Sequence, residues 1–314
     1  MKANLSKRFS GPDIRVSIDR LTIVADYLTD EYDRNLKIFL SFPFIEEASG
    51  GNAIRVVDDD TNCDVAPEQV AYISVPPFMQ DHIRIDFNPN RGFNSAGGQW
   101  LLRFIAGLSK KHFSRCDVAF DVFNLPEVKD YQVWDFGTSK SIFYSRSWEM
   151  ETTYYGSPSS QKQIRQYNKK LEQEKRHGKI LNVDSWWRVE LQLRGNKIDS
   201  YPSLVKEMLE KFYIPSYKNL ENPSQRAIVL SMMVDPTIYA SASKATQQRW
   251  RKLFKSVSKE NEISVAMARC FVENFRRLEF ELHDIMNRFN IVVEENLFDQ
   301  NDPKGERKGG SHDE

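Results

Sequence analysis

The segment of residues 152–179 constrains the fold of this chain more than any other. Its sequence, TTYYGSPSSQKQIRQYNKKLEQEKRHGK, contains two strand-like runs that are joined by a Gly-Ser-Pro turn and followed directly by a charged helical run. This pattern predicts an antiparallel hairpin that leads into a helix. Because side chains alternate between the faces of a strand, four of them are predicted to share one face of the second run: Gln163, Arg165, Tyr167 and Lys169.

Tyr167 lies between two cations in this arrangement, which makes its phenol oxygen a candidate nucleophile for a phosphodiester. Arg165 and Lys169 would attract a phosphate and favour the phenolate form of Tyr167, whose ordinary pKa is about 10. The alternative is a tyrosine that packs on the sheet beside solvated basic residues. The residues alone leave both interpretations open.

The rest of the chain predicts the fold class. Further strand-like runs occur at residues 14–26, 53–57, 69–75, 81–88, 113–123, 141–147 and 186–193. Helical spacing occurs at 29–40 and at 95–108, where Ser95 is a candidate N-cap. We therefore predict an α+β fold in which flanking helices cover an antiparallel sheet.

A smaller helical domain is predicted to follow the sheet. From about residue 213 the pattern becomes helical, and Asn222-Pro223 and Asp235-Pro236 are helix-start signals. The second of these helices is predicted to run to about Val257, and a third to cover 260–289. The predicted divisions are a flexible arm at 1–13, a sheet domain at 14–212, a helical domain at 213–290 and a disordered tail at 291–314.

Composition narrows the function classes. The formal net charge is +0, so any binding of nucleic acid must depend on local basic patches. Cys63, Cys116 and Cys270 form no CxxC pair, which argues against a disulfide framework or a structural zinc site. The sequence shows neither a signal-peptide pattern nor a long apolar run, so we expect a soluble, cytoplasmic protein without membrane contact.

Three strand-like runs carry carboxylates that could converge if the strands are neighbours. HIRIDFN contains Asp86, RCDVAFD contains Asp117, and WRVELQL contains Glu190. Such oxygen ligands suit Mg²⁺ or Mn²⁺. Each run also contains an arginine on the same face, so the alternative is a ladder of arginine–carboxylate pairs across the sheet.

Two further residues are held in reserve as metal ligands. Asp121 is four residues from Asp117, which is roughly 13 Å along an extended strand, so the two cannot bind one ion. His82 is a possible fourth ligand, although a lone histidine is commonly structural.

Basic residues gather in two places that predict contact with DNA phosphates. The first follows the hairpin, and the second lies in the helical part, where Trp250, Leu253 and Phe254 form an apolar stripe opposite the basic side. The candidate DNA-binding residues are Lys162, Lys170, Arg249, Arg251, Lys252 and Lys255.

Taken in order, IRIDFNPN, SRCDVAFDV, TTYYGSPSSQKQIRQYNKK, WWRVELQL and RAIVLSMM resemble the trans-acting Rep initiators of rolling-circle plasmids from Gram-positive bacteria. The resemblance extends from residue 14 to about 257. IRQYNKK is its most specific part, because the tyrosine of that motif is the family's nicking nucleophile and Tyr167 occupies its place. Family members often have Glu at the position of Asp86, which weakens the assignment of Asp86 as a ligand.

The resemblance implies a plasmid replication initiator that binds the double-strand origin through its helical part. It would be a DNA nicking-joining endonuclease that uses Mg²⁺ or Mn²⁺. Tyr167 would form a 5′-phosphotyrosyl intermediate, leave a free 3′-hydroxyl and later rejoin the strand, and Arg165 and Lys169 would offset phosphate charge. A homodimer and a host helicase are the implied partners. The alternatives are a metal-dependent hydrolytic nuclease and a DNA-binding regulator without catalysis.

Overall fold

The computed structural model describes residues 13–48, 53–58, 68–76, 81–91, 93–177 and 181–289. The predicted arm before Asp13, the predicted tail at 291–314 and Cys63 lie outside the described residues. None of the helices in this described part of the chain is both long and apolar enough to cross a membrane.

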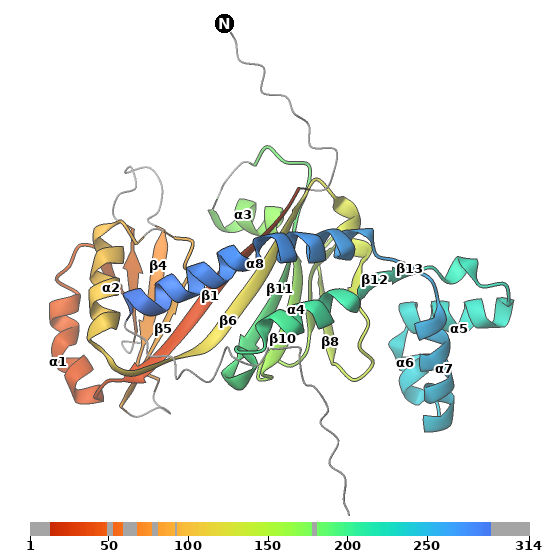
Figure 1. The fold of residues 1–314 in the computed structure, drawn as a ribbon, viewed down its shortest axis with the longest axis horizontal. Coiled ribbons are helices and arrows are strands. Elements are labelled where there is room, and N and C mark those ends of the chain that lie inside the picture. The colour runs from red at the N-terminus through yellow and green to blue at the C-terminus, as the bar shows by residue number, and fades with distance from the viewer. Residues whose placement is uncertain are drawn as a thin grey trace, which may run out of the picture. The chain divides into compact units, whose positions relative to one another are not determined.

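A large sheet dominates the structure (Figure 1). Every neighbouring pair of its strands whose register is described is antiparallel. In hydrogen-bonded order its strands are β2 (Ile45–Glu47), β3 (Ala53–Val57), β4 (Gln69–Ser74), β5 (His82–Phe87), β1 (Asp13–Asp26), β6 (Ser109–Phe123), β11 (Trp186–Arg194), β10 (Lys162–Asn168), β9 (Met150–Tyr155) and β8 (Lys140–Tyr144).

The remaining elements are helices and one small sheet. The small sheet has the order β13 (Lys259–Glu260), β12 (Phe212–Pro215) and β7 (Gln132–Val133). The helices are α1 (Thr29–Phe39), α2 (Ala96–Gly107), α3 (Lys169–His177), α4 (Tyr201–Glu210), α5 (Pro223–Val234), α6 (Pro236–Ser241), α7 (Lys244–Ser256) and α8 (Glu262–Arg288), with short 3₁₀ turns at Pro126–Asp130, Gly195–Lys197 and Tyr217–Asn219. The predicted α+β class is confirmed.

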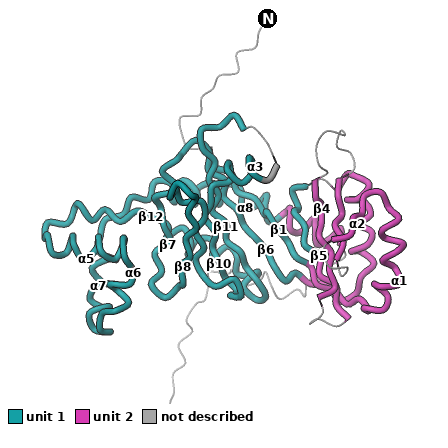
Figure 2. The backbone as a smooth tube through the Cα atoms, turned by 180° about the vertical axis from the view of Figure 1, so that it is seen from behind, with its two compact units in different colours: residues 1–22, 86–91, 113–279 teal, residues 23–85, 92–112, 280–314 magenta. Residues whose placement is uncertain are grey.

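The backbone divides into two compact units (Figure 2). Unit 1 contains residues 1–22, 86–91 and 113–279, and unit 2 contains 23–85, 92–112 and 280–314. The predicted boundary at residue 212 does not coincide with this division, because β12 pairs with β7 and the first part of α8 packs on β1 within unit 1. Two functional roles stay predictions: nicking and joining of DNA by residues 14–212, and recognition of DNA by residues 213–290.

In unit 1 the sheet has an apolar face and a polar face. Val189 on β11 is the register partner of Phe120 on β6, and both are fully buried. The rings of Phe120 on β6 and Tyr201 on α4 each lie 6.3 Å from that of Phe271 on α8, so α4 and α8 cover the apolar face. The alternating residues of the same strands form the polar face, which carries the predicted site residues.

The helical part of unit 1 has its own small core. Val229, Met232 and Phe254 are buried in it, and Trp250 and Leu253 pack against it, which confirms the predicted apolar stripe of α7. The predicted start of α5 is also confirmed, since the Asn222 side chain accepts hydrogen bonds from two backbone N–H groups of the first turn.

One helix prediction is wrong in this part. The helix expected from Pro236 to about Val257 is two helices, α6 and α7, separated by Ala242 and Ser243. The break has a local cause, because the Ser243 side chain accepts a hydrogen bond from Thr246 N–H and so begins a new helix.

Unit 2 packs α2 against β3 and β4. Ser95 caps α2 by accepting a hydrogen bond from Gly98 N–H, as predicted. The ring of Trp100 stacks on that of Phe104 with centroids 4.9 Å apart. A small residue is required where the helix meets the sheet: a Cβ on Gly97 would lie 2.6 Å from the Val57 carbonyl oxygen and 3.0 Å from Val56 Cγ1.

We therefore expect Gly97→Ala to lower the free energy of unfolding by about 1–3 kcal/mol, because the backbone of β3 cannot yield to the new methyl group as a flexible side chain could. Gly107→Ala, at the other end of α2, is the matched control, since nothing lies within 4 Å of its Cβ position. Urea denaturation of the two variants measures the difference. Equal stabilities would show that the contact of α2 with β3 is not close in solution.

Candidate functional site

Tyr167 lies on β10, on the polar face of the unit 1 sheet. Its register partners are Arg188 on β11 and Thr152 on β9, and its side chain is only 3% exposed. The Arg165 guanidinium carbon lies 3.7 Å from the centroid of the Tyr167 ring. The strand register places Gln163, Arg165 and Tyr167 on one face of β10, as predicted.

Lys169 reaches Tyr167 from a different element than predicted. The strand ends at Asn168, and Lys169 is the first residue of α3. Its Nζ nevertheless lies 5.5 Å from the centroid of the Tyr167 ring. Glu172, one helical turn later, pairs with Lys169 and lies 3.9 Å from Arg165, so both cations of the predicted pair are partly neutralised.

The electrostatics of Tyr167 differ from the prediction. Burial raises the pKa of the Tyr167 phenol well above its ordinary value, and the charge of Glu190 raises it further, against the opposing charges of Arg188 and Arg165. Desolvation of the phenolate therefore outweighs the neighbouring cations. In this conformation the phenol holds its proton at neutral pH, and a nucleophilic attack requires a group that accepts the proton.

Arg165 has an unused donor. Its Nε is buried, yet no hydrogen-bond partner for it occurs among the residues that the structure describes. A buried N–H group without a partner costs roughly 1–3 kcal/mol. An anion that entered beside Tyr167 would remove this cost.

Asp117, one of the predicted metal ligands, is paired with an arginine. Asp117 accepts two hydrogen bonds from Arg115, at 2.7 and 2.6 Å. Burial alone would lower the pKa of Arg115, but the hydrogen bond and charge of Asp117 raise it above its ordinary value, and the charges of Glu190 and Asp86 add to this. The charges of all three predicted carboxylates therefore act on one half-buried arginine.

Glu190 and Asp117 interact directly. Burial, followed by the charges of Asp117 and Asp19 and by a hydrogen bond with Asp117, raises the pKa of Glu190 to about 8, although Arg165 opposes this. Glu190 also accepts a hydrogen bond of 2.9 Å from Gln192. Two buried carboxyl groups whose charges oppose each other mark a place that would accept additional positive charge.

Asp86 is held separately. Its carboxylate pairs with Arg20 at 3.0 Å and accepts a hydrogen bond from the Thr22 hydroxyl, both on β1. Within the described residues, no three His, Cys, Asp or Glu side chains are grouped as a metal site. The arginine–carboxylate pairs predicted as the alternative are thus present, although they are largely buried.

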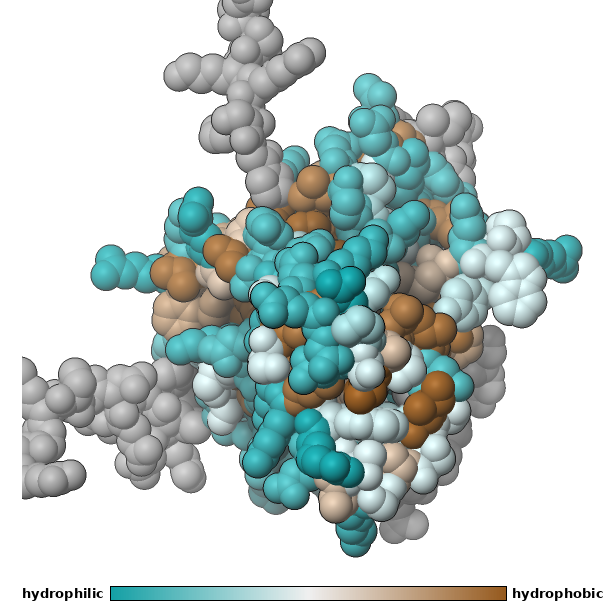
Figure 3. Space-filling model, turned by 90° about the vertical axis from the view of Figure 1, so that its right-hand side faces the viewer, coloured by the Kyte–Doolittle hydropathy of each residue, from teal (hydrophilic) through white to brown (hydrophobic). Residues whose placement is uncertain are grey.

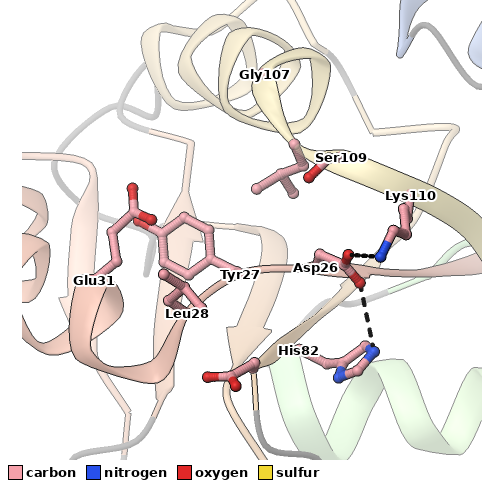
Figure 4. A pocket seen from close by; sticks show the side chains of 10 residues that line it. Asp26, Tyr27, Leu28, Glu31, His82, Gly107, Ser109 and Lys110 are labelled. Carbon is pink, nitrogen blue, oxygen red and sulfur yellow. Dashed lines mark ion pairs between the residues drawn. The ribbon is translucent and has the colours of Figure 1, made fainter.

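The two reserve ligands have other partners. Asp121 pairs with Arg188 at 2.7 Å and accepts a hydrogen bond from the Trp186 indole. His82 lies 3.6 Å from Asp26, which also pairs with Lys110 at 2.8 Å (Figure 4). Asp26, His82 and Lys110 are among the residues that line a cavity of about 540 Å³ in unit 2.

Sequence reasoning missed the contribution of β1 to the polar face. Asn88 donates to Asp19 on β1, while Asp86, two residues earlier on the same face of β5, pairs with Arg20. Two consecutive residues of β1 therefore point to one face, which a regular strand does not allow. Only the unusual sequence Asp19-Arg20 within an apolar run could have indicated this.

The candidate DNA-binding residues fall into two groups. Lys162 pairs with Glu207 at 3.1 Å, and Lys170 donates to the Val183 carbonyl at 2.8 Å, so both have internal partners. The basic residues of α7 are instead exposed, and α7 contains no acidic residue. They include the predicted Arg249, Arg251, Lys252 and Lys255, of which Arg251 contacts the Tyr239 hydroxyl, and also Lys244. Figure 3 shows the molecule from the side on which α5, α6 and α7 lie in Figure 1, where hydrophilic side chains are interspersed with hydrophobic ones.

Comparisons with known proteins bear on this arrangement. Two replication initiation proteins of Staphylococcus aureus are similar to the chain. One is 30% identical over 178 residues, which is 56% of this chain and 55% of that protein. The other is 27% identical over 212 residues, or 67% of this chain and 66% of that protein. The chain thus spans less than two thirds of the length of these curated relatives.

A rolling-circle replication initiator from Geobacillus stearothermophilus has a solved structure that aligns with 68% of this chain and 91% of its own, at 14% identity and a TM-score of 0.36. That likeness is too low to support an argument.

The sequence profile of the replication initiation factors, Rep_trans, matches residues 111–278, which include Tyr167, Asp117, Glu190 and the basic helix α7. Because this match covers more than half of the chain, the protein belongs to the Rep_trans family of replication initiation factors.

Proposed function

We propose that this protein initiates rolling-circle replication of a plasmid by nicking one strand of the double-strand origin with Tyr167. The observation that carries the proposal is the position of the Tyr167 phenol against Arg165, whose buried Nε–H has no hydrogen-bond partner among the described residues. Membership of the Rep_trans family supports it.

The reaction is an exchange of phosphodiester bonds. The Tyr167 oxygen attacks the scissile phosphorus and loses its proton to a base, while the 3′ oxygen leaves and takes up a proton. The products are a 5′-phosphotyrosyl bond and a free 3′-hydroxyl, from which a polymerase can extend. Since one phosphoester bond replaces another, a 3′-hydroxyl can later attack the phosphotyrosine and rejoin the strand without ATP.

Arg165 and Lys169 have distinct parts in this proposal. Arg165 lies directly on the Tyr167 ring and has a donor to spare, so it would bind the scissile phosphate and offset its charge. Lys169 is already paired with Glu172. It would therefore contribute only if that pair separates when the negatively charged strand enters.

A divalent cation, Mg²⁺ or Mn²⁺, belongs to the proposal, and Asp117 and Glu190 are the residues that would hold it. Their buried carboxylate oxygens and the opposing charges of the two groups fit a hard cation. Asp86 is the weakest of the three ligands, because Arg20 and Thr22 already engage it. When bound, such an ion would polarise the scissile phosphate and stabilise charge in the transition state.

The basic side of α7 would supply contacts with origin DNA. Its exposed cations would bind phosphates and would not by themselves select a sequence.

The proposed partners of the protein are a second copy of this chain, in a homodimer, and a host helicase. The chain offers one candidate tyrosine, so the second strand transfer that ends a replication cycle would use Tyr167 of a second subunit.

The first prediction concerns the nucleophile. Tyr167→Phe should abolish cleavage and covalent adduct formation with Mg²⁺ or Mn²⁺ and hairpin-forming single-stranded oligonucleotides from candidate origins, because it removes the attacking oxygen. Binding of DNA should remain. Mass spectrometry of the wild-type reaction should place the adduct on Tyr167.

Tyr154→Phe is the matched control, since Tyr154 lies on the neighbouring strand opposite Arg165 and should keep cleavage. Cleavage that persists in Tyr167→Phe would instead identify a hydrolytic nuclease in which water attacks. Tight binding of DNA by the wild type without any cleavage would favour the regulator.

The second prediction concerns the cation. Asp117→Asn and Glu190→Gln should each weaken Mn²⁺ binding about a hundredfold or more, since even outer partners of metal ligands change affinity about 10- to 100-fold. Asp86→Asn should have a smaller effect. Electron paramagnetic resonance of free Mn²⁺ measures the affinities without reference to activity.

Asp135→Asn is the control for this measurement, because Asp135 pairs with Lys211 elsewhere in unit 1. If Asp117→Asn and Glu190→Gln bind Mn²⁺ as the wild type does, the proposed ligands are wrong and the carboxylates serve only the arginines.

The third prediction concerns α7. Lys252→Ala and Lys255→Ala should each make the logarithmic dependence of duplex affinity on salt less steep by about 0.9, the value for one lost phosphate contact. Lys206→Ala, an exposed cation of α4, should leave the slope unchanged. Fluorescence anisotropy with a labelled duplex of mixed sequence, repeated over a range of salt concentrations, gives the slopes. An unchanged slope in the α7 variants would remove this helix from the DNA interface.

A further inference from the structure

The β8–β9 hairpin of unit 1 exposes large aromatic side chains. All five residues of β8 are exposed, and β8 is the last strand of the sheet, so its outer edge pairs with no strand in the described part of the chain. Phe143 is 57% exposed, Tyr144 52% and Trp148 83%. Exposed apolar edge strands promote aggregation and are usually protected by charges, so this one calls for a functional explanation.

One of these rings, that of Phe143, is connected to Tyr167 by a continuous row of contacts on the polar face. The ring centroids of Phe143 and Tyr154 are 5.8 Å apart. The Arg165 guanidinium lies 5.7 Å from the Tyr154 ring and 3.7 Å from the Tyr167 ring. The strand register agrees, because Phe143 and Tyr167 are both partners of Thr152.

Exposure increases steadily along this row. Tyr167 is buried, Arg165 and Tyr154 are partly exposed, and Phe143 is exposed. The row therefore leads from solvent to the phenol, and an extended ligand could follow it. A cation between two rings near the inner end suits a ligand with both negative charge and flat apolar groups.

The tip of the hairpin is ordered by its own hydrogen bonds. Ser145 Oγ accepts hydrogen bonds from the N–H groups of Ser147 and Glu149, and Trp148 donates its backbone N–H to the Ser145 carbonyl. Trp148 has a φ of 62°, a left-handed conformation that is unfavourable for a bulky residue. The Trp148 ring lies 6.2 Å from Tyr144. These hydrogen bonds order the backbone of the tip, on which the Trp148 side chain is exposed.

We propose that the β8–β9 hairpin is a stacking surface for single-stranded DNA, on which a base next to the scissile phosphate rests against Phe143. The inference deepens the proposed function and rests on it. Single-stranded DNA fits the row because its phosphates match Arg165, while its unpaired bases offer the flat faces that stack on aromatic rings. Such stacking does not depend on base identity, so the surface would position the strand and leave origin choice to other residues.

The test uses Tyr167→Phe protein, in which binding is measured without cleavage. The probe is oligothymidylate with the fluorescent base 2-aminopurine at one position after another, because stacking on an aromatic ring quenches its fluorescence. Phe143→Ala should weaken binding about tenfold or more, the equivalent of about one lost base stack, and should restore fluorescence at one position. Phe143→Trp should keep both the affinity and the quenching.

Two further variants separate stacking from other causes. Phe143→Leu keeps an apolar side chain without a ring face and should behave like Phe143→Ala. Ile142→Ala removes the neighbouring exposed side chain, which alternation directs to the other face of β8, and should behave like the parent protein.

Either of two results overturns the inference. One is that Phe143→Ala leaves oligonucleotide affinity and fluorescence unchanged. The other is that it changes only the oligomeric state in analytical ultracentrifugation, which would make the hairpin an interface between proteins. Cleavage by proteins that retain Tyr167 is scored separately. Loss of quenching in Phe143→Ala would support the stacking surface even if the wild type formed no adduct, in which case only the nicking proposal would fail.

Discussion

The polar face of the unit 1 sheet depends on the pairing of charges that are buried on it. Arg188 is 6% exposed and bridges Asp19 on β1, at 2.6 Å, and Asp121 on β6, at 2.7 Å. Removing one partner from such a buried group costs about 3–5 kcal/mol, so these contacts hold β1, β6 and β11 in one register. β10 then pairs with β11 so that Tyr167 lies opposite Arg188 and Arg165 opposite Glu190, which assembles the candidate site.

The same constraint explains why the site is electrostatically incomplete without a ligand. Arg115 satisfies Asp117, whereas Glu190 is left buried beside Asp117 with a raised pKa, and the Tyr167 phenol is likewise kept neutral by burial. Positive charge near Glu190 would favour its ionised form, and a phosphate would occupy the free donor of Arg165. Ligands of opposite sign would thus stabilise each other's binding, which suits a site that should act only when a strand and a cation are both present.

Local sequence predicted much of this arrangement, because local rules determine it. The alternation of QIRQY places Arg165 and Tyr167 on one face, and Ser95 and Asn222 begin their helices as their capping chemistry requires. The sequence could not predict that β1 lies between β5 and β6, since that order is decided by long-range packing. This insertion brings Arg20 and Thr22 to Asp86, so the predicted three-carboxylate group is divided between two arginines.

The two proposed DNA surfaces of unit 1 differ chemically. Contacts of α7 with phosphates would depend on released counterions and weaken as salt rises, whereas stacking on the β8–β9 hairpin would involve no exchange of ions. Duplex DNA hides its base faces, so only melted DNA can use the second surface. The aromatic row beside Tyr167 would therefore favour a strand that is already single-stranded. Such a preference would confine attack by the Tyr167 oxygen to a locally opened origin, even if α7 bound phosphates of any sequence.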